Sequence, residues 1–274
     1  MAADSAGNFV IVWESYGQDG SRSSVFAKRF SSAGTAIADE FQVNAHTRGY
    51  QRLPALGGVR SVAVDEDGDF VVAWESIKEY SVRFRDVFAR RFSSAGIALA
   101  NEFQVHAYTV DEQTKPSVAT DAAGNFVVTW ASLSPSALGV FGRFFSSLGD
   151  PQAGEFRVNN STWADQPSVA VDADGDFVVV WLGLHDGAGS GVFAQRFLAG
   201  VVAPTTTATI TPTPTSTATA TRTASATLTP TNTITATPRP DEPQKIPMLS
   251  GRFLTILALV LVIVSVGYLS RRRV

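Results

Sequence analysis

The first 200 residues of the chain contain four copies of one sequence unit. Its most distinctive string ends in tryptophan and reads GNFVIVW, GDFVVAW, GNFVVTW and GDFVVVW, at residues 7–13, 68–74, 124–130 and 175–181. A second string follows as VFAKRF, VFARRF, VFGRFF and VFAQRF, at 25–30, 87–92, 140–145 and 192–197. Self-similarity with a period of roughly 50 to 60 residues is typical of folds that stack one supersecondary unit. We therefore expect an array of repeated units.

Two further strings complete the unit. EFQVN, EFQVH and EFRVN lie at 40–44, 102–106 and 155–159, and RSVAVD, PSVATD and PSVAVD lie at 60–65, 116–121 and 167–172. All four strings are short, rich in β-branched and aromatic residues, and bounded by Gly, Asp, Asn or Ser, so each is predicted to be a strand. The first copy lacks the strand that precedes the hairpin, and the fourth lacks an E-F-Q-V-N string after Phe197.

The strand that carries the tryptophan decides between β architectures. Phe70–Trp74 is apolar on both faces, so it must be packed on both sides. An immunoglobulin-type sandwich leaves the outer face of such a strand polar, and β-solenoid repeats are usually shorter. The prediction is an all-β fold, a partial or open β-propeller of about four four-stranded antiparallel repeats. Its copies span about 1–57, 58–114, 115–165 and 166–200.

Bulk composition excludes several functions. The net charge of −3 provides no basic surface for nucleic acid. The chain has no cysteine, which excludes disulfides and thiolate metal sites. His46, His106 and His185 have no ligand-like spacing, so a zinc site or a Ser-His-Asp triad lacks its residues. We predict a non-enzymatic protein without catalytic residues or an organic cofactor.

Aspartates at alternate positions raise the question of a cation site. Copy two carries Asp65, Asp67 and Asp69, and copy four carries the equivalent set, Asp172, Asp174 and Asp176. Oxygen-rich loops of this rhythm bind calcium in other proteins, but the full EF-hand pattern is absent. Copies one and three keep only the residues that a tight hairpin needs. These are Asp or Asn, whose side chain hydrogen-bonds to the backbone of its own turn, and Gly, which adopts positive φ. The hairpin turn is therefore favoured, and weak calcium binding by copies two and four is the alternative hypothesis.

Two segments of different composition follow the repeats. Residues 201–245 are mostly Thr, Pro, Ala and Ser, and predict a disordered, extended linker that can reach on the order of 100 Å. Within residues 246–274, the uncharged stretch 253–270 is about 27 Å long as a helix, which is enough to span a bilayer once. Because Arg271, Arg272 and Arg273 follow it, the positive-inside rule predicts a cytoplasmic C-terminus and repeats outside the cell.

The sequence carries two family resemblances. The repeat, D-x-D-G-D-F-V-V-x-W followed by G-V-F-A-Q-R-F and E-F-Q-V-N, resembles tandem units of large bacterial surface and secreted proteins, which look like propeller blades. The tail resembles the C-terminal sorting domains of the IPTL type, through Ile246, Pro247, Leu249 and Ser250 and the terminal arginine cluster. Met248 replaces the usual threonine of that signature. The second resemblance implies processing by an exosortase-type transpeptidase, which would release the repeats to the extracellular surface.

The sequence thus indicates a bacterial cell-surface or sorted extracellular protein. Its expected role is adhesion or interaction with a glycan or another surface protein, through loops at the ends of the blades. One alternative is that the chain is the C-terminal part of a larger secreted enzyme, for example a glycan hydrolase, whose catalytic part lies upstream. A passive spacer is a third interpretation.

Overall fold

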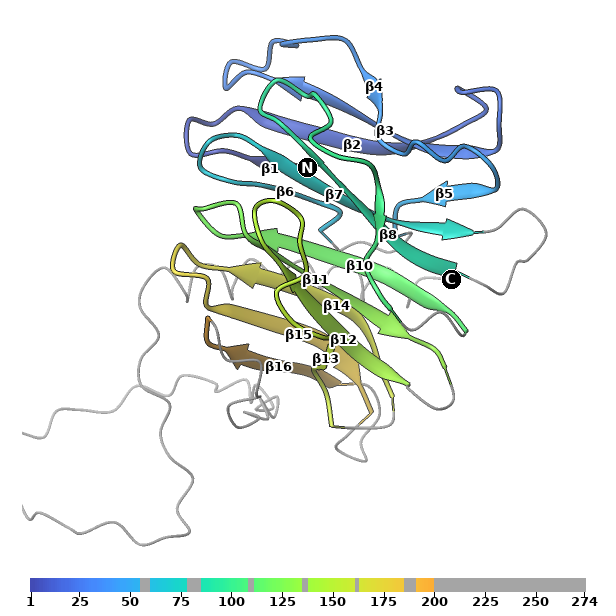
Figure 1. The fold of residues 1–274 in the computed structure, drawn as a ribbon, viewed down its shortest axis with the longest axis vertical. Helices are drawn as coiled ribbons and strands as arrows, with labels where there is room; N and C mark the ends of the chain where they lie inside the picture. The colour runs from blue at the N-terminus through green and yellow to red at the C-terminus, as the bar shows by residue number, and fades with distance from the viewer. Residues whose placement is uncertain are drawn as a thin grey trace, which may run out of the picture.

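The computed structural model describes residues 1–54, 60–77, 85–107, 111–134, 138–160, 163–184 and 191–199. These residues form four antiparallel sheets and no helix (Figure 1). The described part of the chain therefore contains no helix with the length and hydrophobicity needed to cross a bilayer. The predicted linker, sorting signal and membrane segment, and His185, lie outside the described residues.

The described strands form four sheets, one for most of each sequence copy, and the sheets follow one another in chain order. Tyr50–Arg52, Gln113–Thr114 and Ala164–Asp165 lie before the expected copy boundaries but pair in the next sheet. The first sheet contains β1 (Ala2–Ala3), β2 (Phe9–Tyr16), β3 (Ser23–Phe30) and β4 (Phe41–Gln42). The second contains β5 (Tyr50–Arg52), β6 (Val62–Val64), β7 (Phe70–Ile77), β8 (Arg85–Phe92) and β9 (Phe103–Gln104). The third contains β10 (Gln113–Thr120), β11 (Phe126–Ser132), β12 (Gly139–Phe145) and β13 (Phe156–Arg157). The fourth contains β14 (Ala164–Val171), β15 (Phe177–Gly183) and β16 (Gly191–Phe197).

These strands confirm the predicted unit, with three differences in detail. The E-F-Q-V-N strings form strands of only two residues, β4, β9 and β13. In the second sheet the first strand is divided, because β5 and β6 pair with different halves of β7. In the first sheet β1 forms a short first strand, although the first copy was expected to lack one. The fourth sheet has three described strands, as expected from its missing fourth string.

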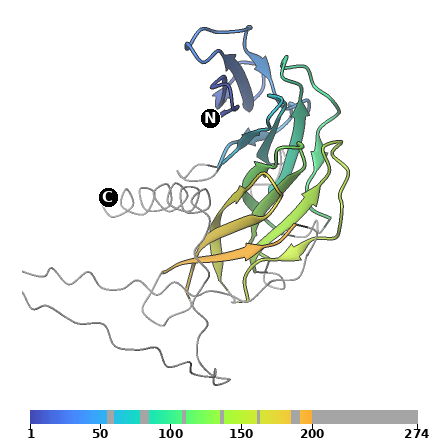
Figure 2. The same cartoon turned by 90° about the vertical axis from the view of Figure 1, so that its left-hand side faces the viewer.

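The four sheets are stacked face to face in chain order, like consecutive blades of a propeller (Figures 1 and 2). The first strands β1, β6, β10 and β14 contact one another in sequence and form the inner side of the stack. The first and fourth sheets lie at opposite ends of the resulting arc (Figure 2). The described residues therefore form an open array.

Three apolar clusters lie between the four sheets. In each cluster the tryptophan-bearing face of one sheet packs on a Val/Ala face of the preceding sheet. Trp74, Trp130 and Trp181 are 0%, 1% and 1% exposed, as predicted, whereas Trp13 in the first sheet is half-buried. The Nε1 atoms of Trp74 and Trp130 donate to Gln51 Oε1 and Gln113 Oε1, each at 3.0 Å.

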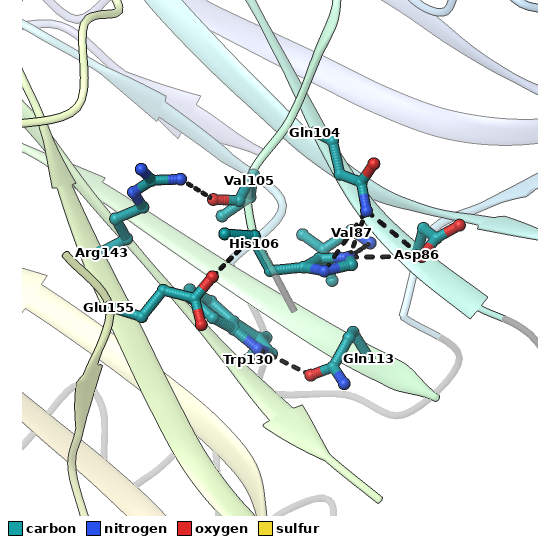
Figure 3. Close-up of polar contacts among 10 residues, drawn as sticks. Asp86, Val87, Gln104, Val105, His106, Gln113, Trp130, Arg143 and Glu155 are labelled. Carbon is teal, nitrogen blue, oxygen red and sulfur yellow. Dashed lines mark hydrogen bonds and ion pairs between the residues drawn. The ribbon is translucent and has the colours of Figure 1, made fainter. Parts of the chain in front are cut away.

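Polar side chains join neighbouring sheets at the rim of each cluster. Glu102 of the second sheet accepts hydrogen bonds from the backbone N–H groups of Ala45 (2.7 Å) and His46 (3.1 Å), which follow β4. Arg90 Nη1 donates to the Val43 carbonyl at 3.0 Å. The next pair of sheets repeats both contacts, since Glu155 accepts from the Ala107 N–H and Arg143 donates to the Val105 carbonyl at 3.0 Å (Figure 3).

A buried carboxylate lies between the second and third sheets. Glu75 is 4% exposed, and its Oε1 accepts a hydrogen bond from the Lys115 N–H at 2.8 Å. Its Oε2 lies 3.1 Å from Arg85 Nη1. Burial raises the pKa of Glu75 above its ordinary value of 4.5, although the Lys115 N–H and the Arg85 charge act in the opposite direction.

This raised pKa predicts a pH dependence of stability. The folded state binds more protons than the unfolded state between the ordinary and the raised pKa, so the stabilising contribution is complete below pH 4.5 and is lost as the pH rises through the folded pKa. We expect the free energy of unfolding of the Glu75→Gln variant to decline less with rising pH than that of the unmodified chain. Urea unfolding followed by tryptophan fluorescence measures it. The exposed Glu66→Gln is the matched control. Identical pH profiles for Glu75→Gln and the unmodified chain would contradict the assignment.

Candidate functional site

The fifth position of the VFAKRF-type string lies between two sheets, at the end where their hairpin turns lie. In the second sheet this residue is Arg91, whose side chain lies against the Gly149 turn of the third sheet. Burial lowers the pKa of the Arg91 guanidinium below its ordinary value, whereas the charges of Asp69, Asp65 and Asp150 act in the opposite direction. The cavity left at this junction has a volume of about 10 Å³, roughly the space of one water molecule.

The equivalent position in the third sheet is Phe144, and the junction with the fourth sheet is open. The Phe144 ring turns into the aromatic cluster, edge-on to Phe177 at 4.8 Å and 5.8 Å from Phe156. No arginine therefore crosses this junction from the fifth position. The cavity there has a volume of about 480 Å³, which is in the range of small-molecule binding sites.

The open junction, which we call the 3/4 pocket, combines apolar and polar groups. Its nine lining residues come from the hairpin turns of the third and fourth sheets and from the strand ends beside them: Asp121, Asn125, Phe144, Phe145, Gln152, Ala153, Asp174, Gly175 and Ala199. None of them is basic. Asp174 and Gln152 are exposed at the rim, whereas Phe144 is half-buried. The pocket therefore offers ring surface and oxygen and amide groups, and no cation for an anionic ligand.

The aspartates predicted as calcium ligands take part in the hairpin turns. Asp65 Oδ1 accepts from the Asp69 N–H at 2.9 Å, and Asp69 Oδ1 accepts from the Ser94 N–H at 2.6 Å. In copy four, Asp172 Oδ1 accepts from the N–H groups of Asp174 (3.1 Å) and Asp176 (2.9 Å). These contacts confirm the turn role that the sequence favoured.

The other carboxylate oxygens of these aspartates do not converge on one point. Asp176 pairs with Arg196 at 2.6 Å, and Asp67 and Asp174 extend into solvent. Across the described ranges, no group of three or more His, Asp or Glu side chains is arranged to hold a metal ion. Weak calcium binding by copies two and four stays a prediction.

The turn aspartates also have a role that the sequence did not suggest. A Cβ added at Gly124, where φ is +79°, would lie 2.8 Å from Asp65 Oδ2, so the first aspartate of one turn contacts the glycine of the next. Asp121 Oδ2 lies in the same way near Gly175. Burial in this contact raises the pKa of Asp65. Glycine is thus required both for positive φ and for close packing of successive turns.

A second candidate, the buried pair His106 and Asp86, proves to be structural. His106 Nε2 accepts a hydrogen bond from the Val87 N–H at 3.1 Å and lies 3.5 Å from Asp86 Oδ1 (Figure 3). Asn44 and Asn159 occupy the same position in the first and third copies, and their Oδ1 atoms accept from Val25 and Val140 at 2.8 and 2.7 Å. His106 therefore accepts the same backbone hydrogen bond as the equivalent asparagines, at a buried position.

The substitution at the 3/4 pocket is visible in the sequence, but its position between two sheets is not. Phe144 interrupts the series Arg29, Arg91 and Arg196. Arg196 pairs with Asp176, and the charge of Arg91 interacts with those of Asp69 and Asp65. That the fifth position faces the following sheet becomes visible only when the sheets are stacked.

No family model matches the chain, and no curated protein matches it in sequence. Three solved structures resemble its fold weakly. A protein of unknown function from Dyadobacter fermentans DSM 18053 is 10% identical over 69% of this chain and 49% of that chain, with a TM-score of 0.47. The Hadza microbial sialidase Hz136 is 14% identical over 74% of this chain and 44% of that chain, with a TM-score of 0.49. The endo-arabinase from Bacteroides thetaiotaomicron VPI-5482 is 9% identical over 69% and 70%, with a TM-score of 0.41.

The aligned region spans less than half the length of the first two of these proteins. All three TM-scores are below 0.5, and no functional conclusion follows from them.

The structural role of His106 predicts which substitutions the chain tolerates. His106→Asn restores the acceptor used at positions 44 and 159, so we expect its free energy of unfolding to stay within about 0.5 kcal/mol of the original. His106→Ala leaves the buried Val87 N–H unpaired, at a cost of about 1–3 kcal/mol. Urea unfolding measures both. Equal losses for the two variants would contradict the role.

Proposed function

We propose that this chain is a non-enzymatic bacterial surface protein that binds a glycan in the 3/4 pocket. The observation that carries the proposal is the replacement of the junction arginine by Phe144, which accompanies a cavity of about 480 Å³ instead of about 10 Å³. The three other copies have Arg at this position. A departure from the repeat that coincides with a pocket is consistent with a binding site on a structural scaffold.

The chemistry of the lining favours a glycan without negative charge. The C–H face of a sugar ring is apolar and can pack on Phe144, as other apolar surfaces pack on aromatic rings. Hydroxyl groups can donate to Asp174 and exchange hydrogen bonds with Gln152 at the rim. Because two carboxylates and no basic residue line the pocket, acidic sugars are disfavoured, and neutral or amino sugars fit.

Display at the cell surface belongs to the same proposal. The Thr/Pro-rich segment 201–245 is proposed to hold the repeats away from the membrane, and residues 253–270 are proposed to anchor it. Ile246, Pro247, Leu249 and Ser250 are the proposed recognition signature for a processing enzyme. This arrangement would place the 3/4 pocket outside the cell, where it meets glycans of the matrix or of neighbouring cells.

Filling the pocket tests the binding site. Phe144→Arg introduces the residue that occupies the same position in the other copies, so we expect it to preserve folding and to weaken glycan binding at least tenfold, or about 1.4 kcal/mol. Binding is measured on an array of neutral, amino and acidic glycans and then by calorimetry with the best neutral or amino sugar.

The control is Leu148→Arg, which adds the same charge at a side chain that is 76% exposed on a turn outside the pocket lining. Equal glycan affinity for the Phe144→Arg, Leu148→Arg and unmodified proteins would refute the site. Recovery of a cleaved glycan would refute the non-enzymatic role. Titration with millimolar CaCl₂ tests the calcium hypothesis in the same samples, and an absence of both heat and melting shift would remove it.

Surface display is tested separately in cells that produce the full chain. We expect the protein to fractionate with the cell envelope, and protease added to intact cells to degrade the repeats. Mass spectrometry of the mature C-terminus then distinguishes a permanent anchor, which retains Arg271–Val274, from a tail cleaved near residues 246–250. A wholly soluble cytosolic protein would contradict the proposed display.

A further inference from the structure

The outer face of the first sheet is the uncovered counterpart of the three buried interfaces. On this face Phe26 is 6% exposed and stacks on Trp13 at 6.3 Å. The other four residues of the face, Phe9, Ile11, Trp13 and Phe30, are half-buried. The residues at the same register positions in the other sheets are at most 3% exposed: Phe70, Val72, Trp74, Phe92, Phe126, Val128, Trp130, Phe145, Phe177, Val179, Trp181 and Phe197. Each of those faces is covered by the preceding sheet. We call the uncovered set the Trp13 face.

The ring geometry of the Trp13 face matches that of the covered faces. Phe9 and Phe30 stack at 5.1 Å and 11°, and Phe70 and Phe92 stack at 5.1 Å and 12°. In the covered sheets a third phenylalanine, from the outer strand of the preceding sheet, packs on the pair. Phe41, Phe103 and Phe156 do this at 5.3, 5.2 and 5.3 Å from Phe92, Phe145 and Phe197. Among the described residues, no ring plays this part for Phe9 and Phe30.

Polar residues at the rim of the Trp13 face also match those of the covered interfaces. Glu40 is the counterpart of Glu102 and Glu155, whose carboxylates accept backbone N–H groups of the preceding sheet. Glu40 instead accepts from Gln18 Nε2, within its own sheet. Lys28 is the counterpart of Arg90 and Arg143, which donate to a carbonyl of the preceding sheet.

From these observations we infer that the Trp13 face is an interface for one further complete sheet of this repeat. The partner presents a Val/Ala face, an outer strand with phenylalanine in the E-F-Q-V-N position, and the backbone N–H groups after that strand. The partner occupies the position that the preceding sheet takes in all three internal interfaces. This inference is independent of the glycan-binding proposal, because the 3/4 pocket lies at the other end of the stack.

A second copy of the chain fits the Trp13 face less well. Its outer-strand residues Phe41, Phe103 and Phe156 are already packed on the following sheets. Its fourth sheet has no such strand among the described residues. A separate copy would therefore bring neither the third ring nor the N–H groups that Glu40 is placed to accept.

The test uses a single thiol, because the chain has no cysteine. Ile11→Cys places that thiol in the centre of the Trp13 face, and Leu148→Cys provides an exposed control. Each variant is made in the chain itself and in an extended chain, in which a copy of residues 111–169 precedes Ala2. That copy supplies a complete sheet and a full first strand for the first sheet.

We expect the thiol of the Ile11→Cys variant to react rapidly with a maleimide in the chain itself. In the extended chain it should react more than about tenfold more slowly, because reaction then requires local opening. The thiol of the Leu148→Cys variant should react equally fast in both chains. The extended chain should also melt in one transition, at a higher temperature than the chain itself.

Two outcomes overturn the inference directly: separate melting of the added sheet, or equal reactivity of the Ile11→Cys thiol in the two chains. A third outcome overturns it in favour of a second copy. In that case the Ile11→Cys thiol of the unextended chain becomes protected as the protein concentration rises, and the protein has a dimeric mass.

Discussion

The structure depends on covering both faces of every tryptophan-bearing strand. A strand such as β7 is apolar on both faces, so both faces must be buried, and a single partner sheet can cover only one of them. Each sheet therefore uses its large aromatic face against the small Val/Ala face of the sheet before it. This alternation of large and small residues allows successive sheets to stack in the same orientation. It also explains why Trp13, whose sheet lies at the end of the described stack, is less buried than the other three repeat tryptophans.

The rims of these interfaces contain the polar residues that the repeats share. Glu102 and Arg90 satisfy backbone groups of the preceding sheet, where the short outer strand ends and no ladder partner exists. The turn aspartates both close their own hairpins and pack on the glycine of the next turn. Residues that look like loose surface charges in the sequence are therefore part of the contact between sheets. The two-residue outer strands leave little exposed edge for pairing with other chains.

The third junction is where the repeat departs from its own pattern. Phe144 replaces the arginine that crosses the preceding junction, and Ala164 replaces the glutamine that pairs with tryptophan in the second and third sheets. Among the described residues, the buried Trp181 Nε1 consequently has no hydrogen-bond partner. An unpaired buried donor destabilises a fold. Both departures from the repeat, at Phe144 and at Ala164, thus lie at the interface between the third and fourth sheets, which also contains the 3/4 pocket.

The sequence by itself determined the repeat, the strands and the burial of the central tryptophans, because period, β-propensity and two-sided apolar pattern are local properties of the chain. It also favoured the turn role of Asp65 and Asp172, since copies one and three kept only the turn residues. Only the tertiary structure decided what Phe144, Glu102 and Trp13 do. Each acts across a gap between two sheets, and the sequence does not state which face of a strand meets the next sheet or how far a side chain reaches. A pocket is the space left between elements, and that space exists only once they are packed.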